Sequence, residues 1–285
     1  MSEKLSIVLP SKNEGKSLEL LLPKLKSCYS SAEIIVIDDG SDDNTGVLCA
    51  DHAVTHVRHT YSKGNGAAIK SGARAATGDI IVFMDADGQH NPEDIPKLLE
   101  PFKNGADMVI GARKASGQAS VARLFANSLY NRLASLLVGH RIEDLTSGFR
   151  AVRRELFLEF LHLLPNGFSY PTTITMCFFR AGYTVLYTPI ETAKRIGRSH
   201  INLLRDGARF LIIIFKIATL YSPLKLFLPI SLVHFTVASG YYFYTYTMFG
   251  RFTNMSALLF VASILIFLIG LVSEQITALL YKNRD

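Results

Sequence analysis

Tryptophan is absent from this chain and cysteine is scarce, since its 285 residues contain no Trp and three Cys. Cys28, Cys49 and Cys177 lie far apart and are odd in number. They therefore form neither the disulfide framework of a small secreted protein nor a paired-cysteine metal motif, and this usage indicates a reducing compartment. Met1 to Lys4 lead directly into an apolar stretch, so we expect no signal peptide.

Long runs of basic residues are also missing, although the net charge is +6. No zinc-finger spacing, basic zipper or RNA-stacking motif occurs, so we expect no nucleic-acid partner. The hydrophobic fraction is 49%, and the C-terminal quarter is much more apolar than the rest. A basic polar part followed by an apolar tail suits a lipid bilayer and phosphate-bearing substrates.

Short apolar runs alternate with segments of helical spacing over the first two thirds of the chain. The expected strands are residues 5–9, 33–38, 54–58, 80–84, 107–111 and 182–189. This alternation predicts an α/β fold with a mostly parallel sheet and helices on both faces. In such a sheet, ligands bind at the carboxyl ends of the strands.

The run from Ile80 to Met84 ends in an acidic cluster. Asp85, Asp87 and Gln89 supply two carboxylates and an amide oxygen at the carboxyl end of an expected buried strand. Such oxygen donors suit Mg²⁺ or Mn²⁺, which hold few protein ligands and complete their shell with phosphate oxygens and water. The alternative for an Asp-x-Asp sequence by itself is a solvated turn.

Two other polar clusters leave alternatives open. Gly64 and Gly66 precede an expected helix whose start either accepts a phosphate or packs tightly on the sheet. Glu143 and Asp144 are candidates for a base, and the alternative is that they cap or brace the loop at 146–150.

After residue 200 the pattern changes. Residues 202–220 are apolar with cations along one side, as expected of a helix at a membrane interface. Residues 224–248 and 257–281 are each long enough to span about 30 Å of hydrocarbon. Glu274, inside the second run, either snorkels to the interface or meets a partner. The expected parts are a cytosolic α/β domain at 1–200, an interfacial helix at 201–222 and a two-helix hairpin at 223–285.

Lysine and arginine flank the two expected spans. They cluster between 194 and 225 and recur at Lys282 and Arg284, whereas the connector carries only Arg251. The positive-inside rule therefore places the α/β domain and both termini in the cytoplasm of an integral membrane protein. Two-span anchors often need helix partners, so a homo-oligomer through the transmembrane helices is one expectation.

Several motifs taken together resemble one enzyme family. They are Pro10…Glu14, Asp38-Asp39-Gly-Ser, Lys63-Gly-x-Gly-Ala-Ala, Asp85-Ala-Asp87-Gly-Gln89-His, Gly111-x-Arg113 and Thr146-Ser-Gly-Phe-Arg150. Over about residues 5 to 200 the chain resembles the family 2 glycosyltransferases of the dolichol-phosphate mannose synthase type. Its tail resembles that of membrane-anchored polyprenyl-phosphate glycosyltransferases. The resemblance implies a GT-A fold and inversion at the anomeric carbon of a single transferred hexose.

Matching positions then imply roles for individual residues. The implied nucleotide-binding residues are Pro10, Glu14, Asp38, Asp39, Lys63, Asp85, Ala86, Asp87, Lys194, Arg195 and His200. The implied metal ligands are Asp85, Asp87 and Gln89, and the implied catalytic residues are Asp85, Asp87 and Arg113. The implied acceptor-binding residues are Arg113, Arg123, Asn127, Ser147 and Arg198. Arg150 either adds charge near the acceptor or is solvated at the surface.

The chain departs from the family pattern at two of these positions. His200 stands where the family carries the lysine of Gly-x-Ser-Lys, which would make that diphosphate contact sensitive to pH. Asn127 replaces a hydroxyl side chain by an amide, which changes the geometry of the contact to the acceptor.

Transfer to a phosphate can also be argued from elementary chemistry, without the family resemblance. A phosphate monoester has a second pKa near ~6, so it is mostly dianionic in the cytosol and is already a nucleophile. A metal ion and arginines need only align two anions and stabilise the departing diphosphate. We expect transfer from a sugar of the UDP-glucose or GDP-mannose class to undecaprenyl or dolichyl phosphate.

Other functions remain as alternatives. A processive polysaccharide synthase would carry a Gln-x-x-Arg-Trp motif, and this chain has no tryptophan. A nucleotidyltransferase would show a glycine-rich diphosphate loop near the first strand, and residues 10–15 do not form one. The two remaining alternatives are an inactive nucleotide-sugar-binding scaffold and a glycosyltransferase that uses a different lipid or glycan acceptor.

Overall fold

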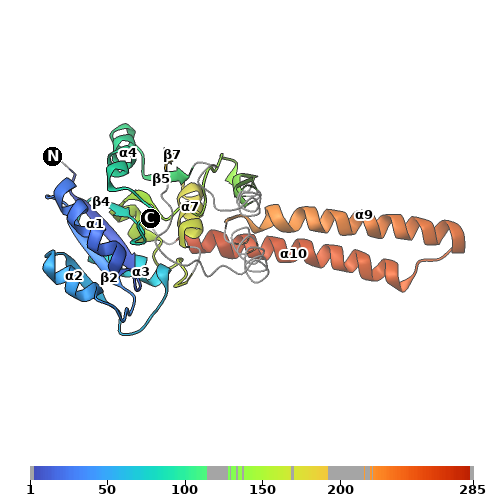
Figure 1. Cartoon of the computed structure of the whole chain (residues 1–285). Coiled ribbons are helices and arrows are strands. Elements are labelled where there is room, and N and C mark those ends of the chain that lie inside the picture. The colour runs from blue at the N-terminus through green and yellow to red at the C-terminus, as the bar shows by residue number, and fades with distance from the viewer. Residues whose placement is uncertain are drawn as a thin grey trace. The chain divides into compact units, whose positions relative to one another are not determined.

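A computed structural model describes residues 3–113, 128, 130–132, 134–136, 138–167, 170–191, 215, 219 and 221–282 (Figure 1). The chain divides into two compact units. The first comprises Met1–Ser135 and His140–Leu203, and the second comprises Leu136–Gly139 and Leu204–Asp285.

The first unit is built on a seven-stranded sheet with the order β3-β2-β1-β4-β6-β5-β7. Its strands are β1 (Leu5–Ser11), β2 (Glu33–Asp38), β3 (Thr55–Arg58), β4 (Ile80–Phe83), β5 (Met108–Arg113), β6 (Arg150–Arg153) and β7 (Val185–Ile190). Every pairing is parallel except those of β6, which runs antiparallel to β4 and β5. The prediction of a mostly parallel sheet is confirmed.

Helices cover both faces of this sheet. They are α1 (Gly15–Cys28), α2 (Thr45–Asp51), α3 (Asn65–Ala75), α4 (Ile95–Leu99), α6 (Arg154–Glu159) and α7 (Tyr170–Arg180), with short 3₁₀ turns η1 (Pro92–Asp94) and η2 (Glu100–Asn104) around α4. On one face, Leu18 and Leu22 of α1 are fully buried in a core with Ile7 and Leu9 of β1. On the other face α3 lies so close that a Cβ at Gly72 would come within 2.2 Å of Val8.

The reversed strand β6 determines what meets at the functional edge. Phe83 of β4 and Ile110 of β5 both pair with Arg150, the first residue of β6. Because β6 is antiparallel, it begins at the edge where β4 and β5 end. The residues that precede β6 therefore lie between Asp85, just beyond β4, and Arg113, the last residue of β5.

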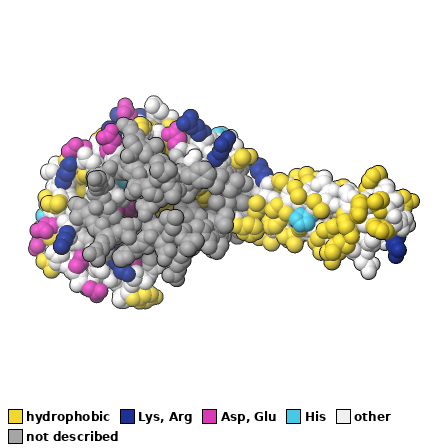
Figure 2. All heavy atoms as spheres, turned by 45° about the vertical axis from the view of Figure 1, so that its right-hand side comes forward, with side chains coloured by type: hydrophobic (Ala, Val, Ile, Leu, Met, Phe, Trp, Pro, Cys, Tyr) yellow, Lys and Arg dark blue, Asp and Glu magenta, His cyan; other side chains and the backbone are white. Residues whose placement is uncertain are grey.

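The second unit contains a hairpin of α9 (Pro223–Phe249) and α10 (Asn254–Lys282). Each helix is about 40 Å long at 1.5 Å per residue, and each is long and apolar enough to cross a membrane. Hydrophobic side chains cover most of the hairpin surface in Figure 2. The two predicted spans are confirmed as helices.

Polar side chains connect the two helices of the hairpin. Ser231 and Ser263 each donate to the other's backbone carbonyl at 3.0 Å. Glu274 of α10 accepts hydrogen bonds from the backbone N–H of Leu224 and the hydroxyl of Ser222. Glu274 thus meets a partner, and it satisfies an N–H at the start of α9 that has no acceptor within that helix.

Candidate active site

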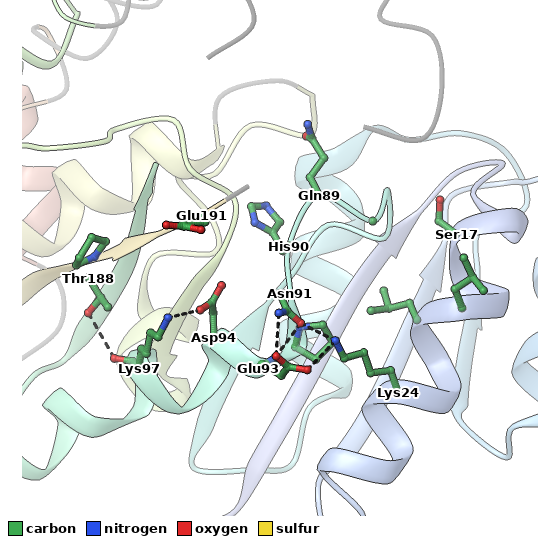
Figure 3. A pocket seen from close by; sticks show the side chains of 15 residues that line it. Ser17, Lys24, Gln89, His90, Asn91, Glu93, Asp94, Lys97, Thr188 and Glu191 are labelled. Atoms are coloured by element: carbon green, nitrogen blue, oxygen red, sulfur yellow. Dashed lines mark hydrogen bonds and ion pairs between the residues drawn. The ribbon is translucent and has the colours of Figure 1, made fainter. Parts of the chain in front are cut away.

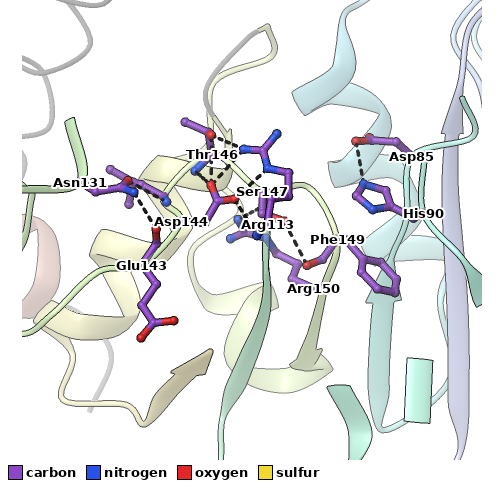
Figure 4. A network of polar contacts seen from close by, with 11 residues as sticks. Asp85, His90, Arg113, Asn131, Glu143, Asp144, Thr146, Ser147, Phe149 and Arg150 are labelled. Atoms are coloured by element: carbon purple, nitrogen blue, oxygen red, sulfur yellow. Dashed lines mark hydrogen bonds and ion pairs between the residues drawn. The ribbon is translucent and has the colours of Figure 1, made fainter. Parts of the chain in front are cut away.

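The acidic cluster lies in the turn directly after β4. The side chain of Asp85 is 37% exposed, and its Oδ2 lies 3.8 Å from Nε2 of buried His90 (Figure 4). His90 stacks on Phe149 with ring centroids 4.9 Å apart. No hydrogen-bond partner for its buried Nδ1 occurs among the described residues. His90 was not among the predicted site residues, although it follows Gln89 directly.

The oxygen donors of this turn are compatible with a hard divalent cation. Asp87 is buried, and its Oδ1 accepts a hydrogen bond from the backbone N–H of Gln89 at 3.2 Å. Within the described part of the chain, no group of three or more His, Cys, Asp or Glu could hold a metal. A cation bound by Asp85, Asp87 and Gln89 would therefore take its remaining ligands from substrate and water, as Mg²⁺ and Mn²⁺ commonly do.

A groove of about 1030 Å³ lies beside this turn, between α1, η1, α4 and the end of β7 (Figure 3). Four of the charged side chains that line it form two ion pairs. Lys24 lies 2.9 Å from Glu93, and Lys97 lies 2.6 Å from Asp94. The side chain of Gln89 points away from these pairs in Figure 3. The sequence did not predict the groove, because four separate elements build its walls.

Arg113 is held by a carboxylate at the opposite side of the site. Its Nε donates to Asp144 at 2.7 Å, and its Nη2 donates to Asp144 at 3.0 Å and to Thr146 at 2.6 Å (Figure 4). Burial of Asp144 opposes its ionisation, but the hydrogen bonds and charge of Arg113 outweigh this and hold the carboxyl pKa below its usual range. The side chain of Arg113 remains 29% exposed.

Asp144 also braces the loop that follows it, because it accepts hydrogen bonds from the backbone N–H of Thr146 at 3.1 Å and from its hydroxyl at 3.2 Å. Glu143 is exposed, and its carboxylate lies 3.7 Å from Arg141. Of the two alternatives for this acidic pair, the geometry favours bracing over a role as base.

The loop at 146–149 fills the space between Asp85 and Arg113. A Cβ at Gly148 would come within 2.8 Å of the Asp85 carboxylate, so a larger residue here would force that carboxylate to move. Ser147 is buried beside it. Arg150 is fully buried and donates to the carbonyls of Ser147 and Pro171 and to the hydroxyl of Thr175. The alternative that Arg150 is a solvated surface residue is wrong, because the antiparallel strand directs it into the interior.

On the predicted nucleotide side, both aspartates at the end of β2 are buried and hydrogen-bonded. Asp38 accepts from the backbone N–H of Ser41 at 2.7 Å and lies 3.4 Å from His56 and 3.6 Å from Arg58. Pro10 and Glu14 are half-buried at the end of β1, and Ala86 is buried after β4.

Asp39 receives four hydrogen bonds. They come from Nδ1 of His59 at 2.7 Å and, each at 2.8 Å, from the hydroxyl of Ser62 and the backbone N–H groups of Lys63 and Gly64. Burial would raise the pKa of Asp39, but these donors lower it to about 2. Nε2 of His59 in turn lies 2.9 Å from the hydroxyl of Ser71 in α3. No sequence motif indicated the contribution of His59.

The two glycines at the start of α3, Gly64 and Gly66, are explained by close packing against a loop. A Cβ at Gly66 would come within 2.1 Å of the carbonyl oxygen of Pro165, and one at Gly64 within 2.7 Å of that of Asn166. The backbone N–H of Ala67 donates to Asn166 at 2.9 Å. The packing alternative is therefore favoured over phosphate binding, although the contact is with residues 165–167 and not with the sheet. The side chain of Lys63 extends over the ring of Tyr61.

Six predicted site residues lie outside the described residues. They are Arg123, Asn127, Lys194, Arg195, Arg198 and His200. The structure therefore places the predicted metal ligands, Ala86 and Arg113 on one sheet edge, with Ser147 between the ligands and Arg113. The remaining described site residues lie at the ends of β1 and β2 and in the segment before α3.

Two family descriptions match the chain. Residues 6–161 match "Glycosyl transferase family 2", and residues 222–279 match "GtrB C-terminal hairpin".

Several proteins are similar to this chain over more than half of its length. A polyprenol monophosphomannose synthase of Mycolicibacterium smegmatis is 32% identical over 74% of this chain and 84% of its own length. An undecaprenyl-phosphate mannosyltransferase of Micrococcus luteus is 32% identical over 70% and 92% of the two chains. A dolichol-phosphate mannosyltransferase of Pyrococcus furiosus is 37% identical over 58% of this chain and 50% of its own.

Solved structures share the fold. Glucosyl-3-phosphoglycerate synthase from Mycobacterium tuberculosis, crystallised with Mn²⁺, UDP and glucosyl-3-phosphoglycerate, matches with a TM-score of 0.60. It is 22% identical over 76% of this chain and 79% of the other. At this identity the match concerns the fold alone.

Proposed function

The chain belongs to glycosyl transferase family 2 and has a GT-A fold. From this premise we propose that it transfers one hexose from a nucleotide-diphosphate sugar to a polyprenyl phosphate, with inversion at the anomeric carbon. One observation carries the proposal: three curated relatives, including two matched over more than four fifths of their length, are named for transfer of mannose to polyprenols or their phosphates. These names favour a donor of the GDP-mannose class over the UDP-glucose class.

In this proposal Asp85, Asp87 and Gln89 hold Mg²⁺ or Mn²⁺, and the nucleotide lies along the ends of β1 and β2. Structural neighbours crystallised with Mn²⁺ and UDP support the use of a divalent cation. When bound, the cation would neutralise the charge that develops on the diphosphate leaving group. Asp85 is the more exposed of the two carboxylates, which suits a contact shared with substrate.

Arg113 is the group proposed to meet phosphate. Its Nε and Nη2 are engaged by Asp144, and no hydrogen bond of its Nη1 occurs among the described residues. In this proposal the N–H groups of Nη1 donate to an oxygen of the acceptor phosphate or of the diphosphate. Because a phosphate dianion needs no strong base, Asp144 is free to act as the fixed anion that orients Arg113.

The hairpin is proposed to anchor the enzyme in the membrane that holds its lipid acceptor. The proposal assigns residues 1–200 to catalysis, 201–222 to the membrane interface and 223–285 to the anchor. The positive charge on both sides of the hairpin supports a cytoplasmic catalytic domain with both termini on the same side.

The test uses the purified full chain in lipid nanodiscs with undecaprenyl or dolichyl phosphate and Mg²⁺ or Mn²⁺. We expect a lipid-linked sugar and free nucleoside diphosphate in equal amounts, faster from GDP-mannose than from UDP-glucose, and loss of both with a chelator. A product that retains the donor's anomeric configuration would contradict inversion. Nucleotide binding without transfer from any donor would instead indicate a scaffold.

A further inference from the structure

Asp144 lies in a short segment whose backbone is tied to a neighbouring helix. The described residues between 128 and 138 include helical Tyr130, Asn131 and Ser135. The hydroxyl of Ser135 accepts a hydrogen bond from the backbone N–H of Ile142 at 2.9 Å. This hydrogen bond therefore links the helix to the segment at 142–146, two residues before Asp144.

Asn131 makes the two contacts on either side of Asp144 (Figure 4). Its Nδ2 donates to the backbone carbonyl of Glu143 at 2.7 Å, and its Oδ1 accepts from the backbone N–H of Leu145 at 3.1 Å. A carbonyl only accepts and an N–H only donates, so this pair of contacts requires a side chain with one donor and one acceptor. An amide supplies both, whereas a carboxylate or an aliphatic side chain does not.

The position of Asp144 in turn sets the position of Arg113. Two nitrogens of Arg113 bond to the two oxygens of Asp144, so the plane of the guanidinium follows the plane of the carboxylate. The backbone N–H of Arg113 also donates to Asp144, at 3.3 Å. Nη1, for which no hydrogen bond occurs among the described residues, therefore takes its direction from Asp144.

We propose that Asn131 is a positioning residue that fixes Asp144 and, through Asp144, aims Arg113 at the phosphate; this rests on the function proposed above. In this proposal Asn131 acts without contacting the nucleotide or the lipid. A displacement of about 1 Å in a group that aligns reactants can lower the rate about 10²-fold. Loss of the amide therefore lowers transfer while nucleotide binding, at the far side of the acidic turn, is retained.

The variants are Asn131→Leu, which removes both hydrogen bonds, and Asn131→Asp, which keeps the acceptor and loses the donor. We expect kcat/KM for the polyprenyl phosphate to fall about 10- to 100-fold in each, with the Kd for the nucleotide changed by less than about two-fold. The matched control is Tyr130→Phe. It removes a hydrogen bond of 3.0 Å from the adjacent residue of the same helix, but that bond leads to Thr172 of α7 and not to Asp144.

A double-mutant cycle separates positioning from a general loss of structure. If Asn131 acts through Arg113, Asn131→Leu lowers kcat/KM in the wild-type background and has little further effect in an Arg113→Ala background. An equal loss in both backgrounds would overturn the proposal. The proposal would also be overturned if the Asn131 variants kept the same kcat/KM as the control Tyr130→Phe.

A spectroscopic measurement tests whether Asn131 positions Arg113 without requiring sugar transfer. If the wild type transfers no sugar, the proposed function fails but this test still applies. In protein labelled with ¹⁵N-arginine, the Nε–H signal that disappears in Arg113→Ala belongs to the bond with Asp144. We expect this proton to exchange with solvent about ten-fold faster in both Asn131 variants and at an unchanged rate in Tyr130→Phe. Unchanged exchange in the Asn131 variants would refute the positioning role.

Discussion

The two sides of the sheet edge hold their charges in opposite ways. On the β4 side, Asp85 keeps 37% of its side chain exposed and has a buried histidine beside it. On the β5 side, Asp144 is only 6% exposed and its oxygens are engaged by Arg113 and Thr146. A carboxylate that would share a cation with substrate thus stays accessible, whereas the carboxylate that orients an arginine is buried with it.

The difference bears on the two tasks of the proposed reaction. In the proposed reaction a bound cation would take part of its ligand shell from the nucleotide diphosphate, and the exposure of Asp85 suits a carboxylate that shares the cation with substrate. An arginine that aligns a phosphate gains from being held in one orientation before the substrate arrives. The loop at 146–149 joins the two sides, because Gly148 lies so near Asp85 that an added Cβ would come within 2.8 Å of its carboxylate, while Thr146 accepts a hydrogen bond from Arg113.

Removal of a carboxylate on the accessible side should have the largest effect. We expect Asp87→Ala to lower the transfer rate about 10²- to 10³-fold, as removal of one strong electrostatic contact in an active site does. The concentration of Mn²⁺ needed for half-maximal rate should rise as well. Asp51→Ala, which removes an exposed carboxylate at the end of α2, serves as the control. Retained turnover in Asp87→Ala would exclude this residue from the metal site.

Asp144→Asn tests the buried side and should have the second-largest effect. The amide keeps the shape of the side chain but leaves Arg113 without its counter-ion. We expect a rate loss of about 10²-fold through misplacement of Arg113 and a free energy of unfolding lower by roughly 3 kcal/mol, at the low end for a buried pair. Chemical denaturation and single-turnover kinetics measure the two quantities.

The shape of the pH–rate profile distinguishes this role from that of a base. If Asp144 only orients Arg113, Asp144→Asn lowers the rate by a similar factor at every pH above the titration of the carboxyl. If it were the proton acceptor, the variant would lose the acidic limb of the profile. In that case carboxylates on both sides of the sheet edge would take part directly in the reaction.

The accessible side could be predicted from the sequence because its residues are local. The strand at 33–38 was predicted with the bounds that β2 has, and Asp85, Asp87 and Gln89 follow a strand whose apolar run is continuous. A strand and the turn after it place such residues at the sheet edge without any knowledge of the rest of the fold. The two hairpin helices were predictable for the same reason, since length and apolar composition are local properties.

The buried side could not be predicted in the same way. Its geometry depends on β6, a strand of four residues that enters between β4 and β5 in the reverse direction. That pairing places the residues before β6, at 144–149, between the ends of β4 and β5 and so beside Arg113. The burial of Arg150 and the packing of Gly66 against Pro165 follow from contacts between distant segments, which neither periodicity nor motif spacing encodes.

Asp39 extends the comparison to a buried carboxylate whose hydrogen bonds come from His59, Ser62, Lys63 and Gly64. Its substitution should have the smallest effect of those considered. Its pKa is lowered to about 2 by the donors around it, from the ordinary 3.8. Its stabilising contribution is therefore complete above about pH 4 and is lost as the pH falls toward 2. We expect the gap in unfolding temperature between wild type and Asp39→Asn to be largest at neutral pH and to close over that interval. Ser62→Ala, which removes one of the four donors, should move the closing upward in pH by a fraction of a unit. A gap that stayed constant down to pH 2 would mean that hydrogen bonds to a neutral side chain stabilise this turn as well as hydrogen bonds to a carboxylate. Asp144 would then be needed for its charge, and Asp39 only for its shape.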